Sequence, residues 1–164
     1  MPRIKHLKIM RVHSIRVKRM VNDKRFLRRL SYLSTIHIDK NYDIPYVAGY
    51  SKDARIVFID RHLNTKMDKV DVTLCIVMHE IVEKALLDIF NLTYAQAHHI
   101  ATYIEHEYAT KHNINWKKYI KFLDPQMKHI GHEKVKKIPK SLDLEPYEDE
   151  KDFELLKRMK LHAR

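Results

Sequence analysis

The sequence predicts a helix-dominated α+β fold. Only two glycines and five prolines occur in 164 residues, and leucine, isoleucine, lysine and glutamate are abundant, which is typical of helix-rich chains. β-Branched and aromatic residues gather in one region, in the segments STIHID, IPYVAGYS and RIVFID. This region predicts one small sheet that contains a hairpin.

The helices are predicted from apolar residues that recur at helical spacing. Residues 14–34 carry this pattern among basic residues and predict one or two amphipathic helices. Residues 70–90 predict the first strong helix, and Thr93 is placed to cap a second helix over 94–112. A third helix, NWKKYIKFL, is expected to stop before Pro125, because proline disfavours helix in the residue that precedes it.

These elements predict a core with an extension at each end. The core is an α+β unit over residues 36–124, which is long enough to bury a sizeable apolar interior. Residues 1–35 form a basic helical N-terminal extension. Residues 125–164 form a charged C-terminal extension, with a short helix expected in KDFELLKRMKLH.

The net charge of +11 is unevenly spread. Residues 1–29 hold eleven Lys or Arg against one acid, whereas residues 143–154 hold seven Asp or Glu against one Lys. A basic arm of this kind attracts nucleic acid through counterion release. The alternatives are a solvated helix face that docks on the acidic segment, or pairing between the arm and the acidic segment of neighbouring chains.

The composition also favours a soluble, cytoplasmic protein. The longest apolar stretch, around VTLCIVM, is too short to cross a bilayer, and the N-terminal sequence lacks the apolar core of a signal peptide. The single cysteine, Cys75, excludes an internal disulfide, and its apolar neighbours predict a small buried side chain. No membrane partner is expected.

The segment HEIVE places polar side chains inside the apolar stripe of the first strong helix. His79 and Glu83 lie four residues apart, so they share one helical face. Glu80 stands at the border of that face, and Lys84 is predicted to point to solvent. A buried carboxylate costs several kcal/mol unless it is paired. Glu83 therefore needs a partner.

The second helix offers that partner. His98 and Glu105 lie two turns apart on one flank of its apolar face, so antiparallel packing of the two helices brings them towards His79 and Glu83. Two imidazoles and a carboxylate are a common ligand set for a catalytic zinc ion, and also for non-haem iron. Two alternatives remain. One is a hydrogen-bonded polar cluster without metal, and the other is that HEIVE occurs by chance on an exposed surface.

HEIVE resembles the His-Glu-x-x-His helix motif of the zincin metallopeptidases, with Glu83 where the second histidine normally stands. RIVFID resembles the strand before the zincin motif, and AHHIATYIEHE resembles the helix after it. The resemblance implies that His79 and Glu83 are metal ligands and that Glu80 is the general base. It also implies a third ligand from the second helix, either His98 or Glu105.

The resemblance makes the expected fold and the expected metal more specific. It implies a small sheet packed on a zincin-like helix pair that binds one divalent metal. Zinc is the first expectation, and a glutamate in the second position shifts the preference towards Mn²⁺ or Fe²⁺. The run from GYSKDARIVFIDRHL to AHHIATYIEHE is also similar to uncharacterised proteins encoded by bacteriophages and prophages.

Two functions follow as expectations. The first is a metal-dependent, peptidase-like hydrolase that cleaves a peptide or protein substrate, with RIVFID available to pair with an extended chain. The second is a non-catalytic accessory or structural protein of phage type that binds nucleic acid through residues 1–29.

Overall fold

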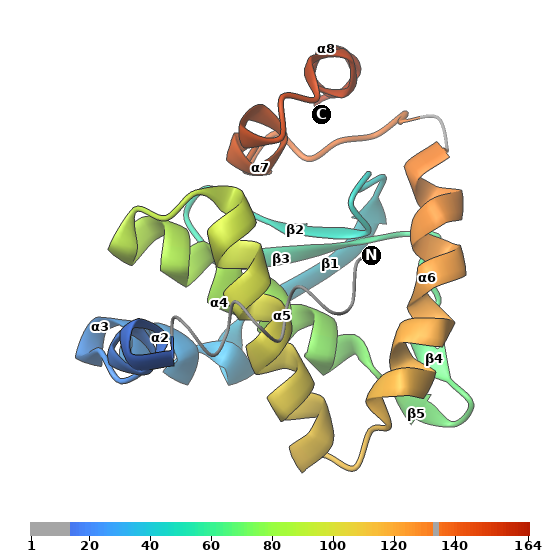
Figure 1. Cartoon of the computed structure of the whole chain (residues 1–164). Helices are drawn as coiled ribbons and strands as arrows, with labels where there is room; N and C mark the ends of the chain where they lie inside the picture. Colours follow the sequence, from blue (N-terminus) through green and yellow to red (C-terminus); the bar gives the residue numbers. More distant parts are fainter. Residues whose placement is uncertain (1–13, 133–134) are drawn as a thin grey trace.

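The protein is described by a computed structural model over residues 14–132 and 135–164 (Figure 1). The predicted helix-dominated α+β fold is confirmed. The elements in chain order are α2 (Ser14–Val21), α3 (Lys24–Ser31), a 3₁₀ turn η1 (Leu33–Thr35), β1 (His37–Tyr42), β2 (Ala48–Tyr50), β3 (Ile56–Asp60), β4 (Lys66–Met67), β5 (Val70–Asp71), α4 (Thr73–Phe90), α5 (Tyr94–Lys111), α6 (Trp116–His132), α7 (Glu145–Asp149) and α8 (Phe153–Leu161).

The main sheet has the order β1-β3-β2. The predicted hairpin is β2 and β3, which pair antiparallel, while β1 pairs parallel to the other edge of β3. The side-chain oxygen of Ser51 closes the hairpin turn by accepting hydrogen bonds from the backbone N–H groups of Arg55 and Ile56 (3.1 and 3.0 Å). Because β3 has a partner strand on both edges, the expectation that RIVFID is free to pair with a substrate is wrong.

Both faces of the sheet are covered (Figure 1). Successive residues of β3 point to opposite faces. Val57 and Ile59 pack in one apolar cluster with Val77 of α4, whereas Phe58 packs in another cluster with Tyr147 of α7. The sheet is therefore the middle layer between the α4 and α5 pair and the C-terminal helices.

The N-terminal helices α2 and α3 are amphipathic, as predicted. Val17, Met20 and Phe26 pack in one apolar cluster with Leu86 of α4, and most of the basic side chains face outward. Figure 1 draws α2 and α3 beside α4, away from α7 and α8. The described part of the basic arm thus lies apart from the acidic segment, and residues 1–13 of the arm lie outside the described residues.

The C-terminal segment is fastened to the core by Asp43. One carboxylate oxygen of Asp43 accepts hydrogen bonds from the backbone N–H groups of Lys136 and Lys137 (2.7 and 2.8 Å). The other oxygen pairs with Arg61 (2.6 Å). The predicted C-terminal extension therefore packs on the core and completes its second apolar layer.

Replacement of Asp43 by Ala is expected to lower the free energy of unfolding by about 1–3 kcal/mol, because two partly buried backbone donors lose their acceptor. Chemical denaturation measures the change. Glu107→Ala on α5 is the control, because Glu107 is exposed and its loss should change the stability little. Equal stability of the two variants would show that Asp43 does not hold the C-terminal segment.

The prediction that the third helix stops before Pro125 is wrong, because α6 continues to His132 with Pro125 inside it. An interior proline costs about 3 kcal/mol through its missing N–H and its clash with the preceding turn. Leu123 and Ile130, on either side of the proline, are buried in the core. The side chain of Gln126 also ties α6 to the backbone of Asn64, by donating to the carbonyl and accepting from the amide (3.2 and 2.8 Å). These contacts offset the cost of the proline.

Cys75 lies on the core side of α4 and is 1% exposed, so the predicted small buried side chain is confirmed. Burial, and then the charge of Glu105, raises the pKa of the Cys75 thiol to about 12. Within the described ranges, no helix has both the length and the apolar character to cross a membrane.

Candidate metal centre

The two long helices that carry HEIVE and AHHIATYIEHE form an antiparallel hairpin. Asn91 ends α4 in the left-handed conformation, with φ of 51°. Thr93 begins α5 with a capping box, in which the Thr93 side chain and the Gln96 side chain each bond the other's backbone N–H. The short connection turns the chain back, so α5 packs along α4 as the sequence predicts.

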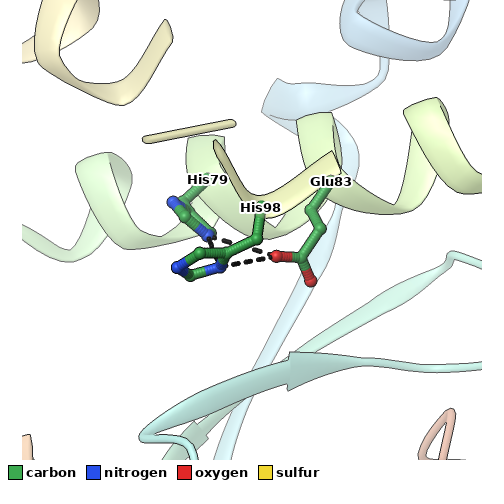
Figure 2. A group of neighbouring side chains, drawn as sticks. All are labelled: His79, Glu83 and His98. Atoms are coloured by element: carbon green, nitrogen blue, oxygen red, sulfur yellow. Dashed lines mark hydrogen bonds and ion pairs between the residues drawn. The ribbon is translucent and has the colours of Figure 1, made fainter. Parts of the chain in front are cut away.

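His79, Glu83 and His98 come together between these helices (Figure 2). His98 Nδ1 lies 2.9 Å from Glu83 Oε2 and 3.0 Å from His79 Nε2. His79 Nε2 lies 3.4 Å from the same oxygen of Glu83. Three ligand atoms from two helices thus form a small triangle.

Protons alone do not satisfy this triangle. Each ring nitrogen offers either one N–H or one lone pair, and the carboxylate offers lone pairs. If His79 Nε2 donates to both His98 and Glu83, the nitrogen of His98 faces the oxygen of Glu83 with no proton between them. A cation satisfies all three lone pairs at once. Bonds of about 2.0–2.2 Å at angles near 90–110° place ligand atoms about 3.0–3.5 Å apart, close to the observed separations.

Glu105 lies behind the triangle. Its Oε2 accepts a hydrogen bond from His79 Nδ1 (3.0 Å), on the opposite side of the ring from the nitrogen that faces His98. Its Oε1 accepts a hydrogen bond from the Tyr119 hydroxyl of α6. Glu105 is thus placed to fix the tautomer and the orientation of His79, as carboxylates commonly do beside a metal-binding histidine.

Two tyrosines complete the surroundings of the triangle. The hydroxyl of Tyr50 in β2 donates to the second oxygen of Glu83 (3.1 Å), and the hydroxyl of Tyr94 lies 3.5 Å from His98 Nδ1. Burial, and then the charges of Glu83 and Glu80, raises the pKa of both phenols. Both remain neutral hydrogen-bond donors.

Glu80 faces a cavity of about 40 Å³ beside the triangle. It is 8% exposed and has no hydrogen bond to any described residue. The cavity is lined by Tyr46, Ala48, Gly49, Tyr50, His79, Glu80, Glu83, Tyr94, His98, Asp143, Pro146 and Tyr147. An unpaired carboxylate therefore stands next to the candidate ligands, with space for water.

The charges of the site are interdependent. Burial, and then the charge of Glu83, raises the pKa of Glu80. Burial acts in the same direction on Glu83, but hydrogen bonds from His79 and His98 outweigh it and lower the pKa of Glu83. Burial lowers the pKa of His79, but the carboxylates of Glu105 and Glu83 raise it well above its ordinary value. The two glutamates of HEIVE thus differ, since Glu83 is an anion and Glu80 takes up a proton more readily.

The prediction that Lys84 points to solvent is wrong. Lys84 is buried, and its Nζ donates to Asp88 (2.7 Å) and to Asp143 of the C-terminal segment (2.8 Å). Tyr147 and Asp143 line the cavity and were not among the predicted site residues. No local pattern links these positions to HEIVE, because the contact forms only when the C-terminal segment folds back over α4.

Comparison of the chain with protein-family models, curated proteins and solved structures gives no match. The functional argument therefore rests on the geometry of the site.

Proposed function

We propose that this protein is a metal-dependent hydrolase that cleaves a peptide or a similar amide. His79, Glu83 and His98 hold one divalent metal, and Glu80 is the general base. Glu105 positions His79. The resemblance of HEIVE and AHHIATYIEHE to the zincin motif helix and the helix after it supports the same proposal.

The convergence of three lone pairs beside an unpaired buried carboxylate carries this proposal. A structural polar cluster needs each polar atom to have a partner, because an unpaired buried group costs free energy. Here the triangle has one edge that protons leave unsatisfied, and Glu80 borders the cavity beside it. A site that binds a cation and moves a proton accounts for both features.

The donor set fits zinc first. Two imidazoles and one carboxylate leave a further coordination position open, and Mn²⁺ or Fe²⁺ also accept this set. A bound divalent metal supplies Lewis acidity, which polarises a substrate carbonyl and makes water more acidic. The identity of the metal is part of the proposal and is read directly by elemental analysis.

The protein side chains handle the protons and the developing charge. Glu80 takes a proton from the attacking water and passes it to the leaving amine. Burial, and then the charge of Glu83, raises the pKa of Glu80 above that of a free glutamate, which suits a group that both gains and loses a proton. The Tyr94 phenol, which lines the same cavity, is available to donate a hydrogen bond to the oxyanion that forms on the carbonyl.

Removal of metal provides the test of this function. Hydrolysis of a quenched-fluorescent peptide library is expected to fall to background after dialysis against a chelator and to return when Zn²⁺, Mn²⁺ or Fe²⁺ is added back. Calcium is the control, because it prefers six to eight oxygen ligands. Activity that survives complete metal removal would contradict the proposal.

A second candidate function, nucleic-acid binding, is favoured by the outer face of α2 and α3. Five basic side chains on it are exposed and form no ion pair among the described residues: Arg16, Lys18, Arg19, Lys24 and Arg28. Such a face binds phosphates by counterion release, and the remaining four basic residues of the arm, in 1–13, would add to it.

Salt dependence tests this second function. Affinity for a labelled duplex is expected to fall by more than about tenfold between roughly 50 and 200 mM salt. A Lys18→Gln/Arg19→Gln/Arg28→Gln variant should lose most of the binding. The matched control is Lys117→Gln/Lys118→Gln/Lys121→Gln, which removes the same charge from exposed positions of α6. Equal losses in both variants would mean that only the overall charge matters.

A further inference from the structure

The segment of residues 141–149, called the strap below, adds to the sheet beside the candidate metal centre. The backbone N–H of Lys52 donates to the carbonyl of Ser141 (2.8 Å), and the N–H of Asp143 donates to the carbonyl of Tyr50 (2.9 Å). Leu142 bridges antiparallel to Ser51 between these two bonds. The strap thus holds the end of β2 in the way that an extended peptide pairs with a sheet edge.

The strap also covers one side of the cavity, while the side chain of His98 on another side is 39% exposed. Asp143, Pro146 and Tyr147 line the same cavity as Glu80 and the three candidate ligands. The ring of Tyr147 lies 4.4 Å from the ring of Tyr46. A cavity of about 40 Å³ holds one or a few water molecules. A peptide that pairs with the edge of β2 therefore reaches Glu80 only when the strap moves aside.

A charged latch fixes the strap to α4. Asp143 Oδ2 lies 2.8 Å from Lys84 Nζ, and only 7% of the Lys84 side chain is exposed. Asp88 holds the other side of the same ammonium group (2.7 Å). When the strap leaves, Lys84 keeps one of its two carboxylates. The ammonium group then favours a new carboxylate that takes the place of Asp143, since a charge-assisted hydrogen bond is stronger than a neutral one.

We infer that the strap occupies the substrate position, and that the substrate is an extended peptide with a carboxylate that replaces Asp143 on Lys84. This inference rests on the proposed hydrolase function and adds a substrate class and a closed resting state to it. The movement takes Leu142 and Tyr147 out of the apolar cluster that they share with Phe58. Lys151, with φ of 58°, separates the strap from α8, which stays on the sheet through its buried Leu155, Leu156 and Met159.

A reversible lock tests the movement. Lys52 and Ser141 are both exposed and face each other across the antiparallel bridge. A Lys52→Cys/Ser141→Cys variant ties the strap to β2 when oxidised and frees it when reduced, so one protein supplies its own control. Oxidation is expected to slow hydrolysis of the peptide library by about tenfold or more, because the locked strap keeps a peptide from pairing with β2. Equal hydrolysis rates in both forms would overturn the inference.

Hydrogen exchange makes the test independent of metal. The backbone N–H groups of Lys52 and Asp143 are expected to exchange at least about tenfold faster than those of Val57 and Ile59. Exchange of all four only through global unfolding would mean a fixed cover and no strap movement. Absence of bound metal in the parent protein, combined with fast exchange at Lys52 and Asp143, would sink the hydrolase proposal and leave the strap movement standing.

Peptide binding tests the substrate class. The probe is an acetylated, amidated peptide of residues 140–150, KSLDLEPYEDE, which contains the strap, and its partner probe has Asn in place of the Asp of SLDL. In an Asp143→Asn variant the first peptide is expected to bind about tenfold more tightly than the second, because it alone restores a carboxylate to Lys84. A Glu148→Gln variant is the control, because Glu148 is exposed on the same strap, and the latched strap should exclude both peptides.

A third peptide separates two sources of the carboxylate. An acetylated KSLN peptide whose C-terminus is free, so that it ends at the position of Asp143, would assign Lys84 to C-terminal carboxylates if it binds as tightly as the acidic one. Tight binding of the Asp peptide alone would assign it to acidic side chains. Equal binding of all three peptides would overturn the role of Lys84.

Discussion

A Glu80→Gln variant is expected to lose peptide hydrolysis by about 10²–10⁴-fold in kcat/KM, the usual contribution of a positioned general base. Glutamine has nearly the same shape as glutamate, so the cavity stays intact. Glu80 is not a member of the triangle of His79, Glu83 and His98, so metal content should remain that of the parent. Activity and metal content measured on the same preparation separate the two effects.

The control for this variant is Glu107→Gln, an exposed glutamate on α5. It removes the same charge from the same helix pair and is expected to keep full activity. Full activity in Glu80→Gln as well would remove Glu80 from the mechanism. Loss of metal together with activity would instead place Glu80 among the ligands.

The second large effect concerns the metal itself. The parent protein is expected to carry close to one Zn, Mn or Fe per chain, and a His79→Ala/Glu83→Ala variant is expected to carry none. The variant leaves only His98 of the triangle, and one imidazole does not hold a divalent ion at micromolar concentrations. Elemental analysis of untagged protein measures both contents and names the ion.

His37→Ala is the control for histidine content, because His37 is exposed on β1. Its metal content should equal that of the parent. Absence of metal in every protein, together with a loss of about 3–5 kcal/mol of stability in the double variant, would assign HEIVE to a buried polar cluster. The basic face of α2 and α3 would then become the first candidate for function.

The helices and the hairpin could be predicted because their signals are local. Apolar periodicity located α4 and α5, Thr93 marked the start of α5, and β-branched runs located β2 and β3. The parallel pairing of β1 with β3 has no local signal, because the partner residues lie far apart in the chain. The path of α6 through Pro125 was also beyond prediction, since core packing outweighs the local preference there.

The candidate site likewise has a part that local sequence patterns predict and a part that they do not. Helical periodicity placed His79 and Glu83 on one buried face and brought His98 towards them, which the structure bears out as a group able to hold a metal. The same periodicity pointed Lys84 to solvent, whereas its ammonium group lies over the ring of Tyr50 in β2. The periodicity carried no information about Asp143, which arrives from the C-terminal segment and buries Lys84.

The burial of Cys75 has a practical consequence. A thiol with a raised pKa that is 1% exposed reacts with an alkylating reagent only in molecules whose α4 has opened. The rate at which Cys75 is alkylated therefore measures how often the protein unfolds. Mass spectrometry gives this rate directly, because Cys75 is the one cysteine of the chain. A metal that binds only the folded protein lowers the alkylation rate, and the effect grows with the ratio of metal concentration to Kd. Alkylation of Cys75 therefore reports occupancy of the site without a substrate.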